Sequence, residues 1–152
     1  ADAAGACDNV VQAAQNVSEY ASIFAPPAPM GGTIASGTYV LKEVTTFASP
    51  DASVPDMPPV LPTGTQVHST IYATASMLRI VEARGTPDGD GGIVFPSDSV
   101  HAEIYSTSAS LLSLTQICPT AGTQASMPYT ATDAGLTLFV SSTEYYGFHL
   151  VP

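Results

Sequence analysis

Histidine, tyrosine and carboxylate side chains alternate with mostly small or apolar ones in two segments of this chain, and such groups bind ligands or exchange protons. The segment 66–73 contains His68 and Tyr72, and the segment 100–107 contains His101, Glu103 and Tyr105. Because successive side chains of a β-strand point to opposite faces, each set shares one face. If both faces turn inward, the five side chains form a polar ligand-binding pocket. If they turn outward, they are ordinary solvated strand surfaces.

Other catalytic and metal-binding patterns are weaker or do not occur in the sequence. His101 and Glu103 place two kinds of metal ligand on one strand face, but no close spacing of cysteine or histidine completes a site. Neither a Gly-x-Ser-x-Gly nucleophile motif nor a glycine-rich phosphate loop followed by lysine occurs. We therefore expect no metal, no cofactor and no assigned catalytic residue. A barrel enzyme that uses His101 and Glu103 remains the less favoured alternative.

Charge and composition exclude several classes of partner. The 152 residues include 13 acidic and only 3 basic side chains, for a net charge of −10. Three basic side chains cannot neutralise a phosphate backbone, so we expect no nucleic-acid partner, and an anionic membrane surface would repel the chain. No apolar run reaches the roughly 20 residues of a membrane-spanning helix, which predicts no transmembrane segment.

The two cysteines, Cys7 and Cys118, allow one disulfide that closes a very long loop. Such a bridge would stabilise the fold by roughly 4–5 kcal/mol on the chain-entropy model. We expect the disulfide and, with the charge-poor, Thr- and Ser-rich composition, a secreted or extracytoplasmic protein. Two alternatives stay open: separate buried thiols, and a lipid anchor on Cys7 in a precursor, suggested by the residues Ala4-Gly5-Ala6-Cys7.

The elements that must position these residues follow from the apolar patterning. Residues 8–24 carry apolar side chains at spacings of three and four, which predicts a helix. The proline- and glycine-rich stretch 25–32 must end it. We therefore divide the chain into an N-terminal helix with its Pro/Gly-rich linker, 1–32, and a β-domain, 33–152.

The rest of the chain has β patterning, with short connections and no helical segment between strands. This predicts a mainly β protein: an antiparallel up-and-down β-barrel of about eight strands with one N-terminal α-helix. A proline-rich loop, 48–64, is expected near the barrel mouth. The expected strands are 39–47, 66–73, 77–84, 93–95, 100–107, 111–117, 127–132, 136–140 and 145–151.

The β-domain resembles the calycin or lipocalin-like barrels of secreted bacterial proteins. Gly37-Thr38-Tyr39 stands where such chains carry Gly-x-Trp at the start of their first strand, and the segments 115–119, 128–132 and 136–139 are similar to the closing strands. The resemblance implies a cavity for a small, mostly apolar ligand. A cell-surface or extracellular structural or interaction protein without such a ligand is the alternative. In either case we expect a monomer or a weak oligomer.

Overall fold

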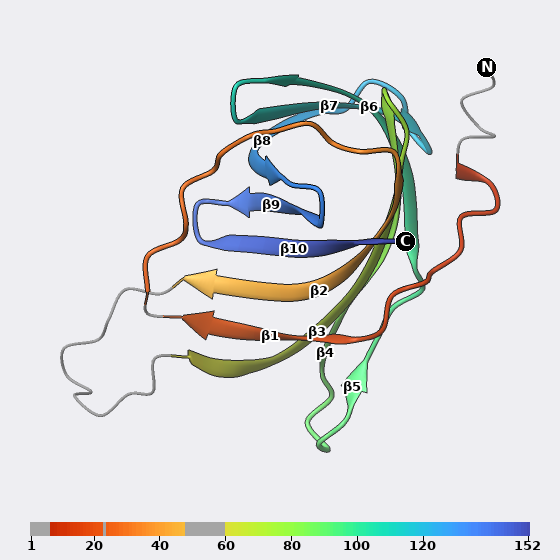
Figure 1. Ribbon diagram of the computed structural model, residues 1–152. Helices are drawn as coiled ribbons and strands as arrows, with labels where there is room; N and C mark the ends of the chain where they lie inside the picture. Colours follow the sequence, from red (N-terminus) through yellow and green to blue (C-terminus); the bar gives the residue numbers. More distant parts are fainter. Residues whose placement is uncertain (1–6, 23, 48–59) are drawn as a thin grey trace.

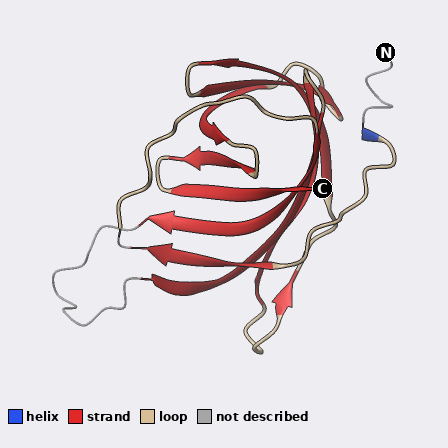
Figure 2. Cartoon of the chain, in the orientation of Figure 1, coloured by secondary structure: helices blue, strands red, loops and turns tan. Residues whose placement is uncertain are grey.

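The computed structural model describes residues 7–22, 24–47 and 60–152, and this part of the chain consists mainly of β-strands (Figures 1 and 2). Each of the nine strands expected from the sequence is present. No helix in the described ranges is long and apolar enough to cross a membrane. The strands are β1 (Val17–Ser22), β2 (Gly37–Phe47), β3 (Val60–Ala73), β4 (Met77–Pro87), β5 (Ile93–Val94), β6 (Ser99–Ser108), β7 (Leu111–Cys118), β8 (Gln124–Ala131), β9 (Gly135–Ser141) and β10 (Glu144–Val151).

The strands close into a barrel. From β2 to β10 each long strand pairs antiparallel with the next one along the chain, and β10 pairs antiparallel with β2 to close the ring. The short β5 only adds to the end of β4. This is the up-and-down meander that the spacing of the strands predicts, because short connections join neighbouring antiparallel strands.

A ninth strand, β1, makes the barrel mixed rather than purely antiparallel. β2 and β3 pair directly only over Gly37–Val40 and Thr70–Ala73. Beyond that point β1 lies between them, parallel to β2 and antiparallel to β3 (Figure 1). Nine strands therefore surround the barrel at the end that contains β1, whereas eight surround it at the other end.

The expected helix over 8–24 is wrong. In the described part of this segment, residues 8 and 9 lie in a turn, residues 10–16 form no regular secondary structure, and 17–22 form β1 (Figure 2). The physical reason is tertiary: the diverging backbones of β2 and β3 offer unpaired hydrogen-bonding groups, and a strand placed there satisfies both edges. That pairing outweighs a weak local helical preference. The expected loop 48–64 is also shorter than predicted, since β3 begins at Val60; residues 48–59 lie outside the described ranges.

Residues 7–16, here called the strap, cross the outer face of β3, β4 and β6. The Cys7–Cys118 disulfide fixes one end of the strap and confirms the expected bridge. Along its length the Tyr72 hydroxyl donates to the carbonyl of Val11 (2.6 Å), and Gln12 Nε2 donates to the carbonyl of Val81 (3.0 Å). The strap thus buries outer-face residues that a bare barrel would expose.

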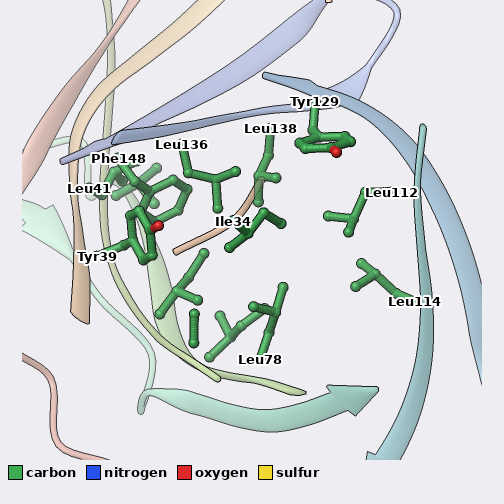
Figure 3. Packing of buried hydrophobic residues seen from close by; sticks show 14 of the residues in the cluster. Ile34, Tyr39, Leu41, Leu78, Leu112, Leu114, Tyr129, Leu136, Leu138 and Phe148 are labelled. Carbon is green, nitrogen blue, oxygen red and sulfur yellow. The ribbon is translucent and has the colours of Figure 1, made fainter. Parts of the chain in front are cut away.

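One end of the barrel is closed by its own core. The segment 24–36, which follows β1 and precedes β2 in the chain, crosses over the barrel (Figure 1). Its Ile34 lies at the centre of the inward-pointing side chains (Figure 3). The Tyr129 hydroxyl donates to the carbonyl of Gly32 and the Tyr39 hydroxyl to that of Ala35 (2.9 Å). These bonds hold the segment in place, so Ile34 acts as a plug at the eight-stranded end.

We expect Thr70→Val to destabilise the fold by about 2–4 kcal/mol in urea unfolding, because it removes the partner that holds the strap. Thr70 is fully buried, and its Oγ1 accepts from the backbone nitrogens of Ala13 and Ala14 (both 3.0 Å) while donating to Gln12 Oε1 (2.6 Å). The control is Thr107→Val, an exposed position near the end of β6, which should change the free energy of unfolding by less than about 0.5 kcal/mol. Equal effects at both positions would contradict this role of the strap.

Candidate ligand-binding cavity

The barrel interior contains a cavity of about 500 Å³ above the plugged end. Exposed residues from 96–99 and Val140 line its outer part, whereas its deeper part adjoins the core around Ile34. A volume of this size is typical of small-molecule sites. Much of the wall is apolar and includes Val67, Ile71, Leu78, Ile80, Leu138 and Phe148.

Three ionisable side chains, Glu82, His101 and Glu103, meet on one wall of this cavity and are here called the inner cluster. Glu82 comes from β4 and the other two from the neighbouring strand β6. His101 Nε2 lies 3.5 Å from Glu82 Oε1, and His101 Nδ1 lies 3.5 Å from Glu103 Oε1. The imidazole therefore stands between two carboxylates. The side chain of Glu103 is 11 % exposed and that of Glu82 is 37 % exposed, so Glu82 is the more accessible acid.

The two carboxylates decide the charge of His101. Glu103 first and Glu82 second raise the pKa of His101 from 6.5 to about 9, against the opposing effect of burial. The imidazole is therefore protonated at neutral pH. Two carboxylates around one imidazolium leave the inner cluster with a net charge of −1. Glu103 Oε2 is buried and accepts no hydrogen bond within the described chain, so its negative charge is incompletely satisfied.

A second set of polar residues, here called the rim cluster, surrounds Arg84 at the nine-stranded end. Arg84 Nη2 lies 2.5 Å from Glu19 Oε2, while its Nη1 lies 3.5 Å from Glu144 Oε1 and donates to the Tyr146 hydroxyl at 3.3 Å. Glu19, on β1, is buried, so this ion pair ties β1 to β4. Burial raises the pKa of Glu144 and raises that of Tyr146 to about 12, which keeps the Tyr146 hydroxyl protonated.

The structure brings two of the five predicted pocket residues into the cavity wall. His101, Glu103 and Tyr105 all point into the barrel, and the first two line the cavity. Tyr105 packs beside the core, and its hydroxyl donates to the carbonyl of Thr74 (2.9 Å) rather than facing the cavity.

His68 and Tyr72 point to the outer face of β3 and do not line this cavity. His68 stacks on Phe95 and contacts Asn16 Oδ1 (2.8 Å) and Asp98 Oδ1 (2.6 Å). Tyr72 bonds the strap. Both residues hold surface segments against the barrel, because on β3 the face with Val67 and Ile71 is the one that turns inward.

The sequence analysis did not place Glu82 and Arg84 in the site, although a signal for them was present. Leu78, Ile80, Glu82 and Arg84 occupy alternate positions of one strand, so the charged pair continues an apolar face. No local pattern links Glu19 to Arg84, because their contact depends on the insertion of β1. Among the described residues, no group of three or more His, Cys, Asp or Glu side chains is arranged to hold a metal ion.

Comparison with protein-family models, with curated proteins and with solved structures finds no match for this chain. The closed barrel is compatible with a calycin-like fold, whereas no family assignment follows.

The inner cluster predicts a specific pH dependence of stability. A His101 pKa that is 6.5 in the unfolded chain and about 9 in the folded one stabilises the fold fully below pH 6.5, and this contribution is lost as pH rises through about 9. We expect the difference in unfolding free energy between the wild type and His101→Asn to decrease over this interval by at most about 3.4 kcal/mol. Urea titrations across the interval measure it.

The matched control is His149→Asn, because His149 is exposed on β10. The change with pH should be larger for His101→Asn, because His101 stands between two carboxylates. A constant difference for His101→Asn would contradict the protonated state of His101.

Proposed function

We propose that this protein binds a small, mostly apolar molecule inside its barrel, as a lipocalin-like extracytoplasmic binding protein. The observation that supports the proposal is the cavity of about 500 Å³, with apolar walls and a few polar groups on one side. Such a combination gives affinity through buried apolar surface and orientation through the polar groups. The Cys7–Cys118 disulfide favours an oxidising compartment.

The cavity and the charge of His101 favour ligand binding over a structural role and over catalysis. A structural or interaction protein has no need of an interior cavity, since a filled core is more stable. For an enzyme, His101 would be the natural proton acceptor. With a pKa of about 9 it holds its proton at neutral pH, which makes it a poor general base.

The proposal is tested by filling the cavity. Met127 lines it from β8, whereas Met30 is 81 % exposed on the segment before β2. We expect Met127→Trp to weaken binding of phenylnaphthylamine, a neutral apolar fluorescent probe, by at least about ten-fold, because the indole occupies part of the volume. Fluorescence titration, excited beyond the absorption of tryptophan, measures the change, and circular dichroism checks the fold.

Met30→Trp is the matched control, since it introduces the same side chain away from the cavity; it should bind the probe like the wild type. Failure of the wild type to bind the probe, or equal binding by both variants, would contradict the proposed function.

A further inference from the structure

We propose that the ligand is an organic cation, an amine with an apolar body, whose ammonium group is bound by Glu82 on the cavity wall. This inference rests on the proposed function and specifies the class of ligand. It depends on the charges of the cavity and on which of its carboxylates an occupant can reach.

The wall of the cavity carries an unbalanced negative charge. The inner cluster contains two carboxylates and one imidazolium, so one negative charge has no partner within it. Arg84 cannot supply the missing positive charge, because Glu19 and Glu144 already bind its two terminal nitrogens. A negative charge beside an apolar cavity is costly unless an opposite charge approaches it. An ammonium group in the cavity would provide that charge.

The carboxylate of Glu82 is accessible to a ligand in the cavity. Glu82 lines the cavity and keeps 37 % of its side chain exposed, although it extends from an inward-facing position of β4. Its neighbours hold its carboxylate in place: Ser69 Oγ donates to Oε2 at 3.5 Å and His101 lies beside Oε1. The side chain of Glu103, by contrast, is only 11 % exposed and lies on the opposite side of the imidazolium. Glu82 is thus the carboxylate that a ligand can contact.

The same charges disfavour anionic and neutral ligands. A carboxylate-bearing ligand would meet Glu82 as a like charge, and the positive groups His101 and Arg84 are each already paired with two acids. A neutral ligand of the same shape would leave the wall charge uncompensated. The net charge of −10 also attracts cations toward the protein over long distance. All three effects favour an amine.

The test compares three probes that share one alkyl chain: decylamine, decanol and decanoate. Each is titrated against the protein loaded with phenylnaphthylamine at neutral pH and low salt. We expect decylamine to displace the fluorescent probe at a concentration about ten- to a hundred-fold lower than decanol, as is typical of a charge-assisted hydrogen bond. Decanoate should be the weakest of the three.

Two variants test whether Glu82 causes the preference for decylamine. Glu82→Gln should reduce the preference for decylamine over decanol to about two-fold or less, without loss of decanol binding. Glu43→Gln changes the net charge equally on the outer side of β2, beside the Tyr145 hydroxyl, and should keep the full preference. If Glu82→Gln does not fold, Glu103→Gln removes the second carboxylate of the same imidazolium and should lower the preference in the same direction.

The outcomes separate this inference from the proposed function. Equal displacement by decylamine and decanol, or stronger displacement by decanoate, would overturn the amine assignment while leaving an apolar binding cavity. A preference for decylamine that survives in Glu82→Gln, or that falls equally in Glu43→Gln, would also overturn it. No binding of phenylnaphthylamine to the wild type would overturn the cavity hypothesis itself.

Discussion

The divergence of β2 from β3 is the constraint on which the rest of this structure depends. Two strands that separate within a closed sheet leave backbone donors and acceptors unpaired, and these must find other partners. β1 supplies them, and it does so at one end only. Since barrel diameter grows with the number of strands, the ring is wider where β1 lies. The cavity opens at this wider end, while the narrower end is filled by ordinary core side chains.

The insertion of β1 also determines what surrounds the cavity. It brings the buried Glu19 to Arg84 and so occupies the guanidinium at the mouth. It places the preceding residues on the outer face of the barrel as the strap, and the following ones over the closed end, where Ile34 enters the core. Within the described residues, 7–16 therefore cover the outer face of the barrel, β1 completes its wall, and 24–36 fill its closed end.

Local patterning predicts the meander but not these N-terminal roles. Alternation and turn residues locate each strand from β2 onward, because a half-buried strand has a period of two wherever it pairs. The side chains of 8–24 fit the spacing of a helix as well as that of a strand. Only the unpaired backbone groups of β2 and β3 favour a strand at 17–22. The same limit applies to the site. His101 and Glu103 turn inward but His68 and Tyr72 do not, because the strap covers the outer face of β3 and allows polar side chains there to be bonded. A single sequence contains no sign of that cover.

The Ile34 plug makes the cavity a blind channel. If a molecule binds there, it and the water that it displaces would pass in opposite directions at the end of the cavity beside Arg84. Because Ile71 and Leu78 lie at the deep end and Glu82 lies nearer the opening, an amphiphilic molecule would enter with its apolar end first and its polar end last. Its residence time would then depend on the side chains of the mouth, whereas its affinity would depend on those of the interior.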